Sequence, residues 1–383
     1  MDYKGYFDRE IERRNTGSIK WDRYKDKDII PLWVADMDFA SPPAVIEALQ
    51  QHAAHGVFGY THAPEELLEI IIHRLQKLYN WAIARDWLVW LPGLVSGLNV
   101  VCRTAGDDGD AALTNTPIYP PFLSAPGLSR RKLVTADLCK VNNRWEMDFD
   151  ILNNAVTPET RLFLFCNPHN PTGRIYTKAE LQQVATFCEQ HDLVICSDEI
   201  HCDLLLDADK RHIPLASLDE AIAQRTITLM APSKTYNMPG LGCAFAIIPN
   251  AYLRTKFRRV MEGIVPYINA LGYTAAQAAY RDGGPWLEAL LAYLAGNRDL
   301  LQERVAALPG ITMTPVQATY LAWLDVHDLG LENPAAFFET QGLGFSDGAE
   351  FGAPGFLRLN FGCPRSLLTE ALNRLEKAVG AIK

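Results

Sequence analysis

Between residues 90 and 250 the sequence alternates short apolar runs with stretches of helical periodicity. The apolar runs are rich in β-compatible residues and bounded by turn formers, and they cover residues 111–114, 161–166, 193–197, 226–230 and 243–248. Residues 177–192 carry apolar side chains at helical spacing, and Thr177 and Glu180 are placed as a capping box. Strands that alternate with helices in this way form a parallel sheet covered by helices. We therefore predict an α/β fold with a mostly parallel sheet.

The pattern changes in the last part of the chain. A long helical stretch at 285–308 leads into further strand-like runs and a final amphipathic helix. The chain has 383 residues, which exceeds the roughly 100–200 residues of a typical domain. We predict a large domain over residues 46–280, and a smaller α/β domain formed by residues 1–45 together with residues 281–383.

The charge of the chain argues against a polyanionic partner. The sequence has 36 Lys and Arg against 45 Asp and Glu, a net charge of −9, and its basic residues form no extended cluster. Binding to nucleic acid or to an anionic membrane surface requires a concentrated positive patch. No apolar run reaches the roughly 18 residues that suggest a membrane span. We predict neither a nucleic-acid partner nor a membrane partner.

The eight cysteines indicate a reducing compartment. They include no Cys-x-x-Cys pair, and Cys166, Cys196 and Cys243 lie inside apolar strand-like runs. Such cysteines are typical of small buried hydrophobic positions rather than of disulfides or metal sites. The charged N-terminal stretch lacks the apolar core of a signal peptide. We predict a cytoplasmic protein without a metal site.

Polar residues follow three successive apolar runs, at the points where the predicted strands end. These residues are Asn170, Asp198 and Lys234. Because ligands bind beyond the carboxyl ends of parallel strands, an amide, a carboxylate and an amine should converge on one crevice. The ordinary alternative for Lys234 is a lysine whose stem packs on apolar surface while its ammonium reaches water. The convergence of the three strand ends argues against that alternative.

This combination of groups suits one cofactor. A lysine forms an imine with an aldehyde only as the free amine, which a partly desolvated site favours. A buried carboxylate needs a cationic partner, and a protonated ring nitrogen supplies one. An Asn amide and a His ring can bond a phenolate oxygen across the same ring. These are the requirements of pyridoxal 5'-phosphate.

The segments that carry these residues resemble a known superfamily. NPHNPTG, SDEIH and SKTYNMPGL are similar to the signature segments of fold type I pyridoxal-phosphate enzymes, the aminotransferase-like superfamily. PLWVADMDFASPP, GVFGYT, TPIYPPF and GFLRLNFGCPRS resemble the cystathionine β-lyase (cysteine-S-conjugate β-lyase) branch. The resemblance covers nearly the whole chain, and the order and spacing of the motifs agree. It implies a large cofactor-binding domain, a smaller α/β domain, and a homodimer with shared active sites.

The resemblance assigns roles around the cofactor ring. Lys234 would be the Schiff-base lysine and the base that removes the substrate Cα proton. Asp198 would pair with the pyridinium nitrogen, Asn170 would donate to the ring oxygen, and Tyr119 would stack on the ring. The ordinary alternatives are a helix N-cap for Asp198, a turn-forming residue for Asn170 and a packed aromatic for Tyr119.

The phosphate site rests on weaker signals. The backbone amides of Leu94 and Val95, at a predicted helix start, would bind the phosphate. Aminotransferase relatives often have a serine three residues before the lysine and an arginine eight residues after it. This chain has Ala231 and Gly242 at those positions. Phosphate binding would then depend on the two amides, on a tyrosine from the neighbouring subunit, and on Ser233.

Three further residues receive roles from the resemblance. Tyr60 would reach the phosphate of the neighbouring subunit, with a surface loop tyrosine as the alternative. His201 stands where many relatives that transaminate carry tyrosine, so it either bonds the ring oxygen or is an ordinary core or surface histidine. Arg358 would clamp the substrate α-carboxylate through its planar guanidinium, rather than face solvent. Asp36 and Asp38 receive no chemical role, since acidic turn residues are common.

The resemblance implies a carbon–sulfur β-lyase. Such an enzyme would cleave L-cystathionine or related S-substituted cysteines, small-molecule sulfur amino acids, to a thiol, pyruvate and ammonia by α,β-elimination. An aminotransferase is the first alternative, and His201 and Gly242 stand against it. A non-catalytic regulator on the same scaffold is the second. The sequence before residue 31 leaves no room for a helix-turn-helix, and the net charge is unsuited to DNA. The preferred sulfur substrate stays open.

Overall fold

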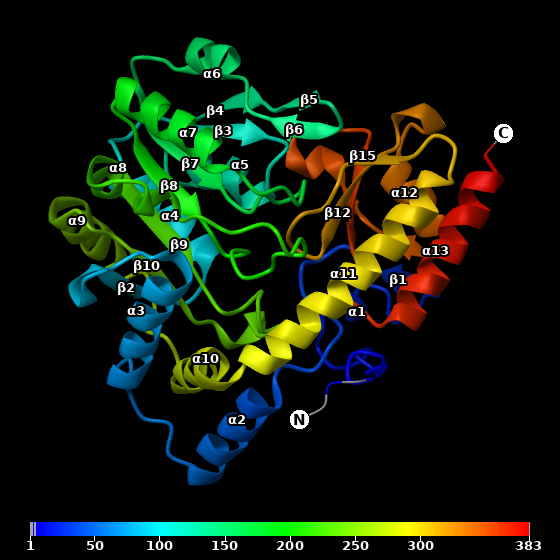
Figure 1. Cartoon of the computed structure of the whole chain (residues 1–383), viewed down its shortest axis with the longest axis horizontal. Helices are drawn as coiled ribbons and strands as arrows, with labels where there is room; N and C mark the ends of the chain where they lie inside the picture. Colours follow the sequence, from blue (N-terminus) through cyan, green and yellow to red (C-terminus); the bar gives the residue numbers. More distant parts are fainter. Residues whose placement is uncertain (1–2, 4, 383) are drawn as a thin grey trace.

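The computed structural model describes residues 3 and 5–382, and its largest element is a seven-stranded sheet with the order β2-β10-β9-β8-β7-β3-β4 (Figure 1). The strands are β2 (Leu88–Leu91), β3 (Ala111–Thr116), β4 (Lys132–Asp137), β7 (Thr160–Cys166), β8 (Val194–Asp198), β9 (Thr226–Met230) and β10 (Ala244–Ile247). Neighbours from β9 to β4 pair in parallel, whereas β10 is antiparallel to both of its neighbours. The predicted mostly parallel α/β sheet is confirmed.

The connection that precedes β10 contains no crossover helix. Residues 231–243 join β9 to β10 and contain only the 3-10 turn η3 (Pro239–Leu241). Parallel neighbours are usually joined through a helix, whereas antiparallel neighbours can be joined by a turn, so this helix-free segment agrees with the antiparallel return of β10. Lys234 lies within this connection and not beside a crossover helix.

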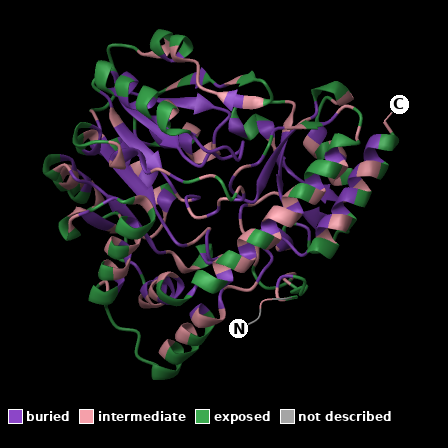
Figure 2. Cartoon of the chain, in the orientation of Figure 1, coloured by how far each residue is buried: buried purple, intermediate pink, exposed green. Residues whose placement is uncertain are grey.

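Helices cover both faces of the sheet, so the central strands are buried on both sides (Figure 2). On β7, Leu162 and Leu164 pack into one core, and Phe163 and Phe165 pack into the other. The first core is shared with α4 (Leu94–Thr104), α5 (Pro120–Leu128) and α9 (Ala251–Met261). The second is shared with α6 (Phe149–Ala155), α7 (Lys178–Gln190) and α8 (Glu220–Arg225).

A smaller antiparallel sheet lies beside the first, with the order β11-β12-β15-β14 (Figure 1). It comprises β11 (Thr312–Met313), β12 (Leu321–Asp325), β14 (Ser346–Asp347) and β15 (Phe356–Asn360). It packs with α11 (Gly284–Ala306), α12 (Pro334–Thr340) and α13 (Arg365–Gly380). The short strand β1 (Ile30–Pro31) pairs in parallel with β13 (Leu343–Gly344). This pairing brings the N-terminal segment against the C-terminal part of the chain.

The remaining elements lie around these two sheets. They are α1 (Ile19–Asp22), α2 (Pro43–His55), α3 (Glu65–Tyr79), α10 (Ala270–Asp282), the 3-10 turns η1 (Arg85–Trp87), η2 (Leu215–Ser217), η4 (His327–Leu329) and η5 (Gly348–Phe351), and the hairpin of β5 (Cys139–Val141) and β6 (Arg144–Glu146). Helix α10 packs against both α2 and α3. Among the described residues, none of the helices combines the length and the apolar character needed to cross a membrane.

The predicted capping box at the start of α7 is present and offers a test of local stability. Thr177 Oγ accepts from the Glu180 amide at 3.3 Å, and the Glu180 carboxylate accepts from the Thr177 amide at 2.7 Å. We expect Thr177→Ala to lower the free energy of unfolding by about 1 kcal/mol, because a helix-start amide loses its acceptor. Urea denaturation would measure the change. Thr186→Ala, at an exposed position inside the same helix, is the control and should cause no loss. Equal losses in both variants would contradict the capping role.

Candidate active site

A cavity of about 240 Å³ opens at the carboxyl edge of the large sheet. It lies where β7, β8 and β9 end and where α4 begins. Eight of the ten predicted site residues line it: Leu94, Val95, Tyr119, Asn170, Asp198, His201, Ser233 and Lys234. The convergence of the three strand ends, predicted from the sequence, is therefore present in the fold.

Lys234 lies half-buried in the cavity wall. Its Nζ donates to the backbone carbonyl of Ala35 at 2.5 Å. Burial lowers the pKa of the amine to about 8, and the neighbouring carboxylate of Asp36 opposes this shift. A larger share of the amine is therefore neutral near pH 8 than for an exposed lysine. A neutral amine is the form that attacks carbonyl carbons and accepts protons.

Asp198 is the last residue of β8, and its side chain is only 4% exposed. One carboxylate oxygen accepts from the Ile200 amide at 3.1 Å. Burial raises the pKa of Asp198 to about 7, and the Ile200 hydrogen bond only partly offsets the effect. A cation placed against this carboxylate would stabilise its charged form. The site therefore favours a ligand with a positively charged group at this point.

Arg358, in the middle of β15, contacts the side chain of Asn170. Its guanidinium donates to Asn170 Oδ1 at 3.0 Å and to the Trp33 carbonyl at 2.7 Å, and it stacks over the Phe351 ring at 4.7 Å. Burial lowers its pKa to about 10, so the group keeps its charge at neutral pH. The side chain is 4% exposed, so the solvent-facing alternative is wrong. Its role toward a substrate carboxylate stays a prediction.

His201 is a buried, neutral ring in the cavity wall. Burial lowers its pKa to about 3, with the charges of Lys234 and Arg358 acting in the same direction. Its Nδ1 has no hydrogen-bond partner within the described part of the chain. The ring lies 6.2 Å from that of Tyr320, nearly perpendicular to it. The alternative of a surface histidine is therefore wrong. A neutral imidazole, which can donate or accept a hydrogen bond, lines the cavity.

The start of α4 offers backbone donors to an anion. Its N-cap residue, Gly93, provides no side-chain cap, and Gly93, Leu94, Val95 and Ser96 all line the cavity. The first amides of a helix lack intrahelical partners and carry a positive dipole. Gly242, where aminotransferase relatives often have arginine, has a φ of +56°, in the left-handed region that favours glycine, and a Cβ there would lie 3.1 Å from the Pro92 carbonyl oxygen.

Tyr60 lies outside the cavity of its own chain. It belongs to the connection between α2 and α3, which projects from the body of the molecule in Figure 1. Tyr60 is 102% exposed, and Val57 and Phe58 beside it are also exposed. The structure of one chain brings Tyr60 to no other predicted site residue. Its assignment to a neighbouring subunit stays a prediction.

Two features of the segment beside Lys234, the role of the Ala35 carbonyl and the ion pairs of Asp36 and Asp38, were not predicted from the sequence. The carbonyl of Ala35 accepts from Lys234, and it also accepts from the Tyr320 hydroxyl at 2.9 Å. Alanine offers no side-chain signal for such a role, because the functional group is in the backbone.

The nearby Asp36 and Asp38, to which the sequence assigned no chemical role, form ion pairs. Arg13 bridges their carboxylates at 2.5 Å and 2.6 Å.

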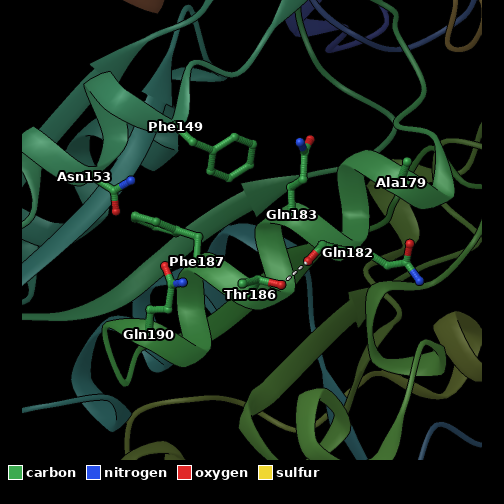
Figure 3. Close-up of a pocket in the computed structure, with 8 residues that line it drawn as sticks. All are labelled: Phe149, Asn153, Ala179, Gln182, Gln183, Thr186, Phe187 and Gln190. Carbon is green, nitrogen blue, oxygen red and sulfur yellow. Dashed lines mark hydrogen bonds between the residues drawn. The ribbon is translucent and has the colours of Figure 1, made fainter.

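A second cavity, of about 460 Å³, lies between α6 and α7 (Figure 3). It is lined by Phe149, Asn153, Ala179, Gln182, Gln183, Thr186, Phe187 and Gln190. These residues offer amides and aromatic rings but no acid, base or thiol. We therefore assign the chemistry to the cavity that contains Lys234.

Comparison with known proteins identifies the family. Residues 27–375 match the model of aminotransferase class I and II. Cystathionine β-lyase PatB of Bacillus subtilis (strain 168) is 34% identical over 97% of this chain and 99% of its own length. The crystal structure of OvoB is 47% identical with a TM-score of 0.96, covering 98% of this chain and 99% of that chain. Cystalysin from Treponema denticola, whose structure contains pyridoxal 5'-phosphate, is 33% identical with a TM-score of 0.94, covering 98% and 99%.

The chain belongs to the aminotransferase class I and II family. Within it, the full-length similarity to PatB supports the cystathionine β-lyase branch. The family and branch predicted from the motifs are confirmed.

The lowered pKa of Lys234 can be measured on the protein without cofactor. We expect the rate of its acetylation by acetic anhydride to rise with pH and to reach half its maximum near pH 8, because only the neutral amine reacts. Peptide mass spectrometry would quantify the modification, with Lys377, exposed on α13, as the internal reference. A Lys234 rate that rises only above pH 10 would contradict the desolvated environment.

Proposed function

We propose that the protein is a pyridoxal-phosphate-dependent carbon–sulfur β-lyase. It cleaves L-cystathionine or related S-substituted cysteines to a thiol, pyruvate and ammonia by α,β-elimination. The observation that carries the proposal is the presence of a desolvated amine, Lys234, and a buried carboxylate, Asp198, in one cavity. The similarity to PatB, which is named a cystathionine β-lyase, supports the reaction class.

The cavity fits pyridoxal 5'-phosphate. Asp198 would hold the ring nitrogen, because a buried carboxylate needs a cation. The amides of Leu94 and Val95 would hold the phosphate at the start of α4, with Ser233 as a further donor. When bound, the cofactor supplies an aldehyde and an electron-accepting ring.

Three side chains would complete the cofactor site. Tyr119, at the start of α5, would pack against the ring. Asn170 and the neutral His201 would bond its phenolic oxygen. His201 serves here as an uncharged partner, since its lowered pKa keeps it neutral across the physiological range.

Three residues would have separate roles in the elimination. Arg358 binds the substrate α-carboxylate through its two-donor edge, a task that suits a guanidinium. Lys234, as a neutral amine, takes the proton from Cα. Asp198 keeps the ring nitrogen protonated. Loss of the Cα proton and departure of the thiolate from Cβ leave a three-carbon fragment, and its hydrolysis gives pyruvate and ammonia.

We further propose a homodimer with shared active sites, located in the cytoplasm. The exposed apolar side chains of Val57, Phe58 and Tyr60 lie on one connection, which suits burial against a second copy. Tyr60 would then reach the phosphate of the neighbouring subunit. All eight cysteines are free thiols, which supports a reducing compartment.

The domain division is likewise a proposal. Residues 46–280 would form the large cofactor-binding domain, and residues 1–45 would join residues 281–383 in the small domain. The parallel pairing of β1 with β13 supports the association of the two chain ends. The strong packing of Phe7 against Trp286 supports it as well, with ring centroids 5.5 Å apart.

The activity is tested with purified holoenzyme and L-cystathionine. We expect equal amounts of pyruvate and free thiol, measured by coupled lactate dehydrogenase and by a thiol reagent. Lys234→Ala should reduce the rate by about 10²- to 10⁴-fold, because the Cα proton loses its acceptor. Lys377→Ala, an exposed lysine on α13, should match the wild type. Amino transfer to an added keto acid without pyruvate would contradict β-elimination and favour an aminotransferase.

The shared site is tested by mixing two impaired variants. Tyr60→Phe should weaken pyridoxal-phosphate binding by about 10- to 150-fold, because a hydrogen bond to a charged group contributes about 1.5–3 kcal/mol. Tyr252→Phe, an exposed tyrosine on α9, is the matched control. Hybrids of Tyr60→Phe and Lys234→Ala chains contain one intact site if Tyr60 acts across the interface. We therefore expect the mixture to exceed the summed activities of the two variants at limiting cofactor. A purely additive mixture would place Tyr60 outside the neighbouring site.

A further inference from the structure

Residues 33–39, here called the strap, run beside the active-site cavity without regular secondary structure. Most of their backbone groups bond to side chains from other parts of the chain, and the Asp38 amide donates to the Gly362 carbonyl at 2.8 Å. Asn360 donates to the carbonyls of Val34 and Asp36, both at 2.7 Å. Arg358 donates to the carbonyl of Trp33 at 2.7 Å. Arg13 and Lys20 donate to the carbonyls of Met37 and Asp36, both at 3.2 Å, so side chains largely set the position of the strap.

Asn237 makes the most complete set of these contacts. Its Oδ1 accepts from the Met37 amide at 2.9 Å. Its Nδ2 donates to the Met37 carbonyl at 2.9 Å and to the Phe39 carbonyl at 2.7 Å. The side-chain amide thus pairs with the strap as a neighbouring strand would, using its acceptor and both of its donors.

The backbone of Asn237 also constrains the residue type. Its φ is +51°, in the left-handed region that favours glycine and tolerates asparagine. Glycine would suit the backbone but would lack the three hydrogen bonds. Alanine would lose the bonds and strain the turn. Asparagine both tolerates the left-handed backbone and makes the three hydrogen bonds, so the contact with the strap explains why asparagine suits this position better than glycine.

The link matters because Asn237 lies three residues after Lys234. The strap end of the link, Met37, lies two residues after Ala35, whose carbonyl accepts from Lys234 Nζ at 2.5 Å. Asn237 and the Lys234–Ala35 hydrogen bond therefore tie the same two segments together at neighbouring points. The Tyr320 hydroxyl also donates a hydrogen bond to the Ala35 carbonyl, at 2.9 Å.

We propose that Asn237 is a positioning residue that holds the strap so that the Ala35 carbonyl orients the Lys234 amine in the cavity. The proposal rests on the proposed function, in which the free amine of Lys234 takes the Cα proton. The Ala35 carbonyl determines where that amine lies whenever it is free. The side-chain amide of Asn237 bonds only to the strap and acts through Ala35, while its backbone carbonyl accepts from Ser41 Oγ at 2.9 Å.

Two substitutions separate the amide from the backbone requirement. Asn237→Gly keeps the left-handed conformation and removes all three hydrogen bonds. Asn237→Asp keeps the side-chain shape and removes both donors. We expect both to lower kcat for pyruvate formation by about 10- to 100-fold, because displacement of a reacting group by an ångström costs that much. KM should stay within about twofold, since substrate binding depends on other groups.

A second readout is independent of activity. Hydrogen–deuterium exchange of the peptide over residues 33–41 should be several-fold faster in both variants, measured by mass spectrometry on the protein without cofactor. Asn143→Gly is the control, because Asn143 has a φ of +60° and lies exposed in the turn between β5 and β6. It should leave both kcat and the exchange of residues 33–41 unchanged.

The outcomes are distinct from those that test the proposed function. Faster exchange of the strap together with a fall in kcat supports the positioning role. Wild-type kcat in Asn237→Gly, or a fall in kcat without faster exchange, overturns it. If the wild type forms no pyruvate from any S-substituted cysteine, the proposed function fails. The exchange rate and the pH profile of Lys234 acetylation in the same variants then decide the positioning role alone, and wild-type values of both overturn it.

Discussion

The partial burial of Lys234 is the constraint on which the rest of the site depends. A lysine that reacts as a neutral amine at physiological pH must lie where its charged form is penalised, and burial provides that penalty. Such an amine still needs a hydrogen-bond partner, and the Ala35 carbonyl is an uncharged one. A carboxylate in direct contact would restore the charge that burial removes. The carboxylates of Asp36 and Asp198 are near enough to oppose the lowering of the pKa of Lys234, but burial outweighs them.

The topology explains how such distant residues meet. Parallel strands β7, β8 and β9 bring Asn170, Asp198 and Lys234 to one edge, and the antiparallel return of β10 leaves room there for an irregular connection. The strap and Arg358 come from the two ends of the chain. Ala35 of the strap lines the cavity, and Arg358 bonds to Asn170, which lines it as well. The complete site therefore depends on tertiary packing and not on any local motif.

The sequence predicted the elements that carry strong local signals and missed those that do not. The buried strands, the capping box of α7 and the three polar strand ends follow from periodicity and turn chemistry. Strand β4 was missed, because an edge strand with exposed polar residues lacks an apolar run. The direction of β10 was missed because residue types do not record strand orientation. The Ala35 carbonyl was missed because every residue has one, and only the fold selects it.

The positive φ of Gly242 limits how this site can change. A substitution of Gly242 by arginine would place a Cβ 3.1 Å from the Pro92 carbonyl oxygen in a left-handed backbone conformation, so the added charge would come with backbone strain. A phosphate held there would depend on neutral amide donors, and interactions with neutral dipoles are screened by salt less than those between full charges. The residue type at position 242 thus links the loop conformation to the tolerance of the site to ionic strength.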